Sequence, residues 1–195
     1  NHEDHIGGMD DVITAYSSAV DCIMLSEEEG TTATYRSVVE AADSSSAEQL
    51  TPKAGETYTL GDATWQILSC DTDMPDLNES SIVIKLTYGN TSFLFTGDAT
   101  MNTEQGLEMS GYDLKSDVLK VGHHGSAGST ADSFLDAVAP EIAVISVDSE
   151  SDMGEMYHHP ATSTLQRLSQ HGIKVYRTDE LGTIRITSDG EQLAV

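Results

Sequence analysis

The segment SIVIKLTYGNTSFLFTGDA (81–99) constrains the fold of this chain more than any other stretch. Its apolar residues stop at Tyr-Gly-Asn-Thr and resume after it, which predicts a β-hairpin around a Gly-Asn turn, ending in Thr-Gly-Asp. Beyond the hairpin, helices over about 102–110, 130–138 and 161–171 are expected to alternate with strands over 117–121, 141–147, 174–177 and 182–187. This alternation predicts a layered α/β fold with functional residues in loops at strand ends.

The half of the chain before the hairpin has weaker patterns. Residues 8–20 carry apolar side chains at helical spacing, and residues 31–43 are expected to form a second helix with a threonine cap. Between them, CIML (22–25) predicts a buried strand, and residues 56–70 predict two strands joined by a Gly-Asp turn. At 195 residues the chain suits one domain, and no apolar run approaches the roughly 18 residues of a membrane span.

The charge of the chain is strongly acidic, with 33 Asp and Glu against 9 Lys and Arg and a formal net charge of −24. Such a surface repels polyanions and lacks the basic stripe of a general nucleic-acid-binding protein. It predicts a solubilising acidic coat. An anionic substrate would need a local source of attraction, and a metal ion is the obvious one.

The two cysteines, Cys22 and Cys70, lie in apolar, strand-like stretches away from any CxxC motif or histidine. This setting predicts buried free thiols. A disulfide between them stays open, because it requires a proximity that the sequence does not show.

Four clusters contain side chains that can bind a metal or catalyse a reaction. In chain order they are His2, Asp4 and His5; Asp98; His123 and His124; and His159. Each alone has an ordinary explanation: frayed terminal histidines, an aspartate that caps a helix, a structural histidine, or surface histidines before a helix. Each also lies where an α/β fold gathers side chains, and imidazole and carboxylate are the usual ligands of zinc, manganese and iron. The residues expected to share one pocket are His2, Asp4, His5, Asp98, His123, His124 and His159.

Together these motifs resemble the metallo-β-lactamase superfamily, whose hallmark is H-x-H-x-D-H, often followed by Gly-Gly. NHEDHIGG (1–8) matches from its second residue onward, so the leading histidine would stand immediately before Asn1. The motifs in NESSIVIKLTYGNTSFLFTGDA, LKSDVLKVGHHGSAGST and TLQRLSQHGIKVYRTDELGTIRI resemble the lactamase-like domain of ComEC-type DNA-internalisation competence proteins and the family's free-standing hydrolases. The resemblance implies an α/β fold, the αββα sandwich, as a single domain over 1–195 that is missing its N-terminal strands.

By position, the resemblance implies two divalent metal ions, zinc or manganese. His2 would bind the first metal together with the upstream histidine, and Asp4 and His5 would bind the second. Asp98 would bridge both ions and orient the attacking water, and His123 would complete the second site. With the upstream histidine absent from this chain, we expect incomplete metal occupancy.

The resemblance also implies residues on the substrate side. His124 and His159 would stabilise developing charge, with His159 at the leaving group or a phosphate, and Ser126 would contact the substrate. Asn78 is a further expected substrate contact. It stands where many family members have a histidine for the first metal, which agrees with the ComEC-like group and points away from true β-lactamases.

The implied function is hydrolysis by a dinuclear site that activates water, with a phosphodiester as the favoured bond. Short nucleic acid, a nucleotide or a cell-wall phosphodiester fits the acidic surface better than long duplex DNA. The alternatives are hydrolysis of an acyl bond, in a lactam or thioester, and a non-catalytic binding module with a degenerate metal site. The acidity and the resemblance favour a location outside the cytoplasm or at the cell surface.

Overall fold

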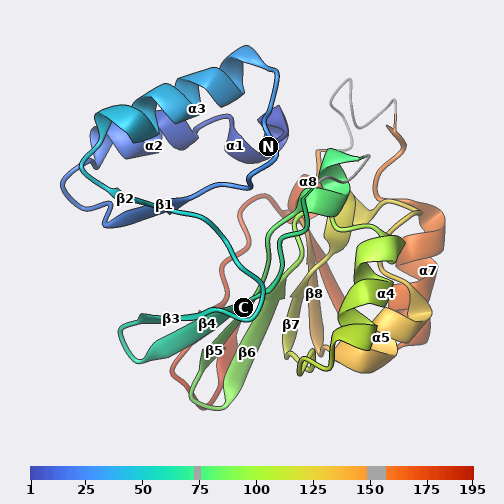
Figure 1. Ribbon diagram of the computed structural model, residues 1–195. Coiled ribbons are helices and arrows are strands. Elements are labelled where there is room, and N and C mark those ends of the chain that lie inside the picture. The colour runs from blue at the N-terminus through green and yellow to red at the C-terminus, as the bar shows by residue number, and fades with distance from the viewer. Residues whose placement is uncertain (73–75, 149–156) are drawn as a thin grey trace.

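The computed structural model describes residues 1–72, 76–148 and 157–195 (Figure 1). Its centre is a seven-stranded mixed sheet in the order β3-β4-β5-β6-β7-β8-β9. The strands are β3 (Thr57–Leu60), β4 (Ala63–Ser69), β5 (Val83–Tyr88), β6 (Thr91–Phe95), β7 (Val118–Lys120), β8 (Ile142–Ile145) and β9 (Lys174–Arg177). Strands β3 to β6 pair antiparallel, and β6 to β9 pair parallel.

The predicted hairpin is confirmed by the pairing of β5 with β6, in which Tyr88 lies opposite Thr91. Gly89 has a φ of +56°, the left-handed conformation that a tight hairpin turn requires and that glycine adopts without strain. The Thr91 hydroxyl closes the turn by donating a hydrogen bond to the Tyr88 carbonyl at 2.8 Å. The predicted alternation after the hairpin is confirmed as well, through β9.

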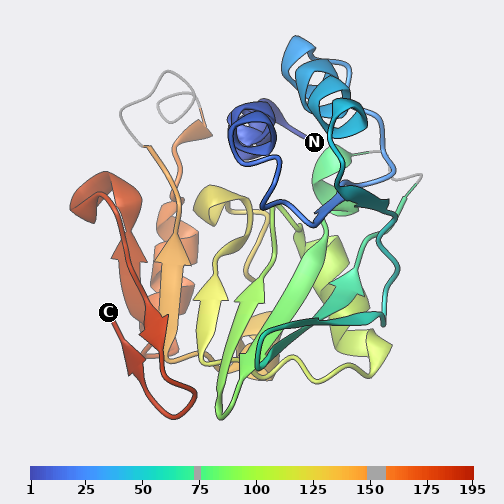
Figure 2. The same ribbon diagram turned by 90° about the vertical axis from the view of Figure 1, so that its left-hand side faces the viewer.

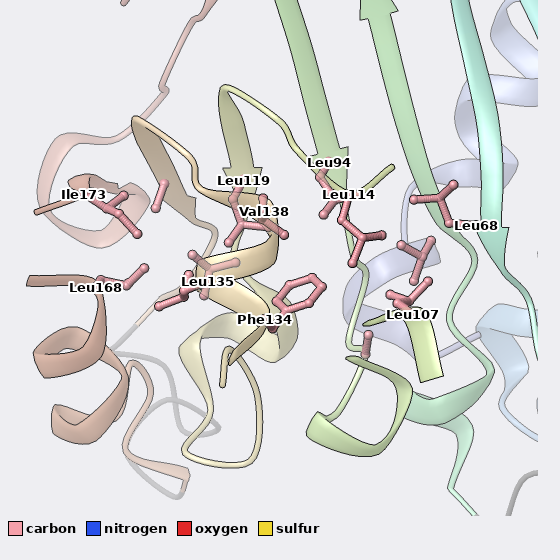
Figure 3. Packing of buried hydrophobic residues seen from close by; sticks show 14 of the residues in the cluster. Leu68, Leu94, Leu107, Leu114, Leu119, Phe134, Leu135, Val138, Leu168 and Ile173 are labelled. Carbon is pink, nitrogen blue, oxygen red and sulfur yellow. The ribbon is translucent and has the colours of Figure 1, made fainter. Parts of the chain in front are cut away.

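The helices α4 (Met101–Ser110), α5 (Asp132–Val138) and α7 (Thr162–Gln170) cover one face of the sheet (Figure 1). Strand residues that point to this face, such as Leu94 and Leu119, pack against Phe134, Leu135 and Leu168 from the helices (Figure 3). Burial of this apolar surface is the main force that fixes the helices on the sheet. Because β6, β7 and β8 are parallel, the loops after them emerge at the same edge.

The first fifty residues form a separately packed unit, here called the N-terminal unit. It contains α1 (Glu3–Ile6), α2 (Met9–Ala15), β1 (Cys22–Met24), α3 (Ala33–Ser44) and β2 (Glu48–Leu50). Strands β1 and β2 pair in parallel, and the unit has its own hydrophobic cluster around Ile13, Ile23 and Val38. The unit lies beyond the edge of the main sheet at which β6 and β7 end (Figure 2). No helix among the described residues is long and apolar enough to cross a membrane.

Three predictions need correction. The helix expected over 8–20 is shorter, and a separate short helix, α1, precedes it. The strand expected over 182–187 is wrong: after α8 (Thr178–Leu181), only β10 (Thr187–Ser188) pairs, with β11 (Leu193–Ala194), in a small antiparallel sheet of its own. The apolar residues of this segment, Ile184 and Ile186, alternate like those of a strand, but neither pairs with another strand.

The predicted burial of the cysteines is also wrong. Both are free, as expected, but Cys22 is exposed and Cys70 is half-buried. Strand β1 belongs to a two-stranded sheet, in which the middle residue Ile23 faces the hydrophobic cluster and its neighbour Cys22 points the other way.

Candidate metal centre

Asp98 is fixed at the end of β6 by the turn Thr96-Gly97-Asp98. Gly97 has a φ of +55°, and a Cβ atom there would lie 2.9 Å from the Ser81 side chain, so this position requires glycine. The Asp98 amide donates a hydrogen bond to Ser81 Oγ at 2.9 Å, and Thr96 Oγ1 donates to the Lys120 carbonyl at 2.8 Å. These contacts hold the Asp98 carboxylate in place while only 4% of the residue is exposed.

Three more side chains that can bind a metal reach Asp98 from two distant segments. His5 Nε2 lies 3.0 Å from Asp98 Oδ2, and His124 Nε2 lies 3.4 Å from Asp98 Oδ1. Asp4 completes the group, with Oδ2 at 3.1 Å from His124 Nε2. One candidate ligand atom from each of Asp4, His5, Asp98 and His124 lies within 4.8 Å of the other three. We call these four residues the tetrad.

The His124 ring is oriented by a backbone contact on its far side. Its Nδ1 lies 2.8 Å from the carbonyl oxygen of Ser146, just after β8, so Nδ1 carries the proton and donates. This leaves Nε2 as the free ring nitrogen that faces Asp4 and Asp98. A histidine that donates its second nitrogen to a carbonyl is a common arrangement for metal ligands, because the contact fixes both the tautomer and the ring.

His123 and His124 both have left-handed backbones, with φ values of +46° and +52°. For residues other than glycine this conformation costs roughly 1–2 kcal/mol each, so it persists only where the surroundings enforce it. The helical turn that contains them is pinned to the neighbouring loops: the His123 amide donates to the Gly97 carbonyl at 3.2 Å, and the Ala161 amide donates to the Gly125 carbonyl at 2.8 Å.

The loop that follows, residues 126–131, is clamped from two helices. Glu104 on α4 is almost fully buried, and its carboxylate accepts hydrogen bonds from the amides of Thr130 and Ala131 at 2.5 and 2.9 Å. Arg167 on α7 donates to the carbonyls of Thr130 and Ser129 at 2.7 and 2.8 Å. These contacts anchor the segment directly after the two strained histidines.

The electrostatics of the tetrad favour an ionised Asp98. Burial raises the pKa of its carboxyl, but the adjacent rings of His124 and His5 outweigh this effect, and the pKa lies below its ordinary value. The same carboxylate raises the pKa of His124, against an opposing effect of burial. His159 behaves differently, because burial and the charges of His123 and His124 lower its pKa.

A cation fits this group of residues. Asp98 Oδ1 and His124 Nε2 are buried atoms without a hydrogen-bond partner, although their neighbours are close. Buried polar atoms are normally paired, and a donor set of two carboxylates and two imidazoles suits zinc, manganese or iron. These observations favour a metal centre over a set of mutually satisfied side chains.

The other predicted residues surround the tetrad. His123 Nε2 lies 3.9 Å from Asp98 Oδ2, and the His159 ring contacts the His123 ring edge-on with centroids 5.5 Å apart. His2 and Asn78 line a cavity of about 200 Å³ that also touches His5 and Asp98. Ser126 accepts a hydrogen bond within its own turn, from the Gly128 amide at 3.2 Å. Their individual roles remain predictions.

Sequence reasoning missed the residues that support the centre. Glu104 and Arg167 looked like ordinary polar residues of amphipathic helices, and no local pattern indicated that both contact one loop. Lys120 carried a signal that could have been used: it is a lysine in an otherwise apolar strand, three residues before His123. Burial lowers its pKa, against the opposing charge of Asp98, and its ammonium donates to the Val121 carbonyl at 2.9 Å.

Comparisons with a family model and with known proteins agree with one another. The family model of the metallo-beta-lactamase superfamily matches residues 1–149. ComE operon protein 3 of Bacillus subtilis is 39% identical over 134 residues, which cover 68% of this chain and 17% of that protein. Competence protein ComA of Neisseria gonorrhoeae is 40% identical over 111 residues, which cover 56% of this chain and 16% of that protein. The chain thus spans about a sixth of the length of these relatives.

Solved structures show the same fold at low sequence identity. CmlA, described as a diiron beta-hydroxylase from Streptomyces venezuelae, matches with a TM-score of 0.57 and 17% identity, over 91% of this chain and 42% of that chain. The metallo-beta-lactamase fold protein YhfI from Bacillus subtilis matches with a TM-score of 0.51 and 11% identity, over 90% of this chain and 69% of that one.

Proposed function

Because the chain belongs to the metallo-beta-lactamase superfamily, we propose that it is a metal-dependent hydrolase that activates water to cleave a phosphodiester bond. The observation that carries the proposal is the tetrad, in which a buried Asp98 is flanked by His5, His124 and Asp4 within ligand distance of one another. The ComEC-like resemblance, and the name of the relative from Neisseria gonorrhoeae as a competence protein, support a substrate related to nucleic acid.

The residues divide into ligands and charge-stabilising groups. Asp4, His5, Asp98 and His124 would hold the metal, with His2 and His123 as further candidate ligands for a second ion. A bound divalent ion supplies activation of water and polarisation of the phosphoryl oxygen. Asp98, kept ionised by its neighbours, accepts a hydrogen bond from the attacking water and orients it.

His159 is the candidate for the leaving-group side. Its lowered pKa favours the neutral imidazole at pH 7, and its Nδ1 is buried without a hydrogen-bond partner. A neutral imidazole can donate one hydrogen bond to a developing oxyanion and so stabilise its charge. His123, which contacts the His159 ring, sets the position of that ring relative to Asp98.

The acidic surface restricts the substrate. With a formal net charge of −24, the chain repels long polyanions, and the bound metal must supply the attraction for an anionic group. A short single strand, a nucleotide or a cell-wall phosphodiester satisfies this restriction, and long duplex DNA does not.

The test is hydrolysis of bis-p-nitrophenyl phosphate compared with nitrocefin, with added manganese or zinc. We expect metal-dependent cleavage of the phosphodiester, its loss in Asp98→Asn, and full activity in the control Asp62→Asn, which changes an exposed turn between β3 and β4. Faster cleavage of nitrocefin would favour an acyl-bond hydrolase. Less than one bound ion per chain, with no cleavage of either compound, would favour a non-catalytic module.

A further inference from the structure

An exposed aromatic ring lies beside the candidate centre. Tyr157 is 55% exposed, so its ring offers a large aromatic surface to solvent at this site. Its ring stacks on the ring of His159, with centroids 5.8 Å apart and planes inclined by only 17°. At this separation the stacking is offset, so much of the tyrosine face remains open to solvent.

The ring of Tyr157 is connected to the tetrad through two histidines. His159 lies between Tyr157 and His123, with its centroid 5.5 Å from that of His123, and His123 Nε2 is 3.9 Å from Asp98 Oδ2. These ring contacts connect Tyr157 to the candidate centre, where the metal would bind the phosphoryl group of a substrate. A substrate that extends from the centre past His159 would therefore contact the Tyr157 ring.

The charge of the chain makes an uncharged source of affinity necessary. Proteins that bind single strands usually combine a basic groove with aromatic stacking, and a chain with a formal net charge of −24 has little of the first contribution. Stacking on an aromatic ring needs no positive charge and accepts any base, because every base has a π-face.

We propose that Tyr157 is a stacking platform for a base near the scissile phosphodiester, so that the substrate is a nucleotide or a short single strand. This inference rests on the proposed function and selects among its substrates. It excludes the cell-wall phosphodiester, whose groups next to the phosphate carry no base. His159 stacks on the platform ring and contacts His123, which lies beside Asp98.

The test is equilibrium binding to the full chain loaded with manganese. The two probes are a fluorescein-labelled thymidine hexanucleotide with hydrolysis-resistant phosphorothioate linkages and an abasic hexamer of the same backbone and charge, measured by fluorescence anisotropy. We expect the wild type to prefer the base-bearing probe by about 5- to 150-fold, the range that stacking of one base gives. Tyr157→Ala should collapse this preference to near unity, and Tyr157→Phe should retain it.

Tyr16→Ala is the matched control, since Tyr16 is an exposed tyrosine at the end of α2 in the N-terminal unit, and its preference ratio should equal that of the wild type. Equal affinity of the wild type for both probes, tighter binding of the abasic probe, no binding of either, or an unchanged ratio in Tyr157→Ala would overturn the platform. Binding without turnover separates the two proposals: a base preference in a chain that cleaves no phosphodiester refutes the proposed function alone.

Discussion

At the scale of single residues, the two adjacent histidines after β7 have different surroundings. The sequence indicated that the pair belongs to the site, and the resemblance favoured His123 as the ligand. In the structure, the ring of His124 is locked by the Ser146 carbonyl and its Nε2 belongs to the tetrad. A contact with a carbonyl that follows a different strand has no signature in the local sequence, so the sequence could not decide between the two histidines.

We predict that His124→Ala weakens metal binding more than His123→Ala does. Loss of one imidazole from four ligands should lower the affinity for zinc by at least 10-fold, and loss of a neighbour outside the tetrad by less. Isothermal titration calorimetry at one pH measures both variants, with circular dichroism to check the fold. The opposite order would assign the ligand to His123.

At the scale of elements, the centre depends on helices that carry none of its ligands. Helices α4 and α7 hold the loop 126–131 through Glu104 and Arg167, while the loop positions the strained histidines before it. The hairpin and the strand–helix alternation were predictable, because their periodicity and turn residues agree locally. The strand expected over 182–187 failed, because alternation alone does not supply a partner strand.

We predict that Arg167→Lys destabilises the chain by about 1–3 kcal/mol, because a lysine has one amine where the guanidinium contacts two carbonyls. Denaturant unfolding measures the change. Arg36→Lys is the matched control, since Arg36 makes one exposed contact, to the Thr31 carbonyl, and should shift stability by less than about 0.5 kcal/mol. Equal shifts in the two variants would show that the clamp adds no stability.

We predict that the contribution of Glu104 to folding stability changes with pH in the direction opposite to that of an ordinary paired carboxylate. Burial raises its pKa above the ordinary 4.5, against the opposing effects of the Ala131 and Thr130 amides and Arg167. The folded state therefore binds the proton more tightly, and the stability contributed by this group is full below pH 4.5 and falls as the pH rises through the folded pKa.

The measurement is the free energy of unfolding of the wild type minus that of Glu104→Gln, taken between pH 4.5 and 7.5, because titrations shared by both proteins cancel in the difference. We expect this difference to shrink with rising pH. Glu108→Gln, on the same helix, controls for the loss of one negative charge. A difference that grows with pH would mean that Arg167 and the two amides outweigh burial.

At the scale of the whole molecule, the dominant property is the excess of negative charge. This excess could be predicted from composition alone. The separate packing of the N-terminal unit could not be predicted, because the sequence patterns of its short elements are weak. Mutual repulsion of like charges destabilises the compact state and is screened by salt.

We therefore predict that raising sodium chloride from about 10 to 500 mM stabilises the chain. An increase of about 1 kcal/mol in the free energy of unfolding corresponds to a rise in Tm of about 2–4 °C for a chain of this size. Differential scanning calorimetry measures the shift, and a neutral osmolyte at matched osmolality is the control. A fall in Tm would indicate that favourable ion pairs outweigh repulsion.

The position of the tetrad has a mechanical consequence. Asp4 and His5 belong to the N-terminal unit, whereas Asp98 and His124 belong to the loops of the main sheet, and the two bodies have separate hydrophobic clusters. An ion shared by all four residues would cross-link the start of the chain to its middle and close a long loop, as a disulfide does. Chelation would reopen that loop and leave the N-terminal unit tethered by the segment between β2 and β3, where limited proteolysis would then cut first. The same four side chains that would activate water would also fasten one body of the molecule to the other.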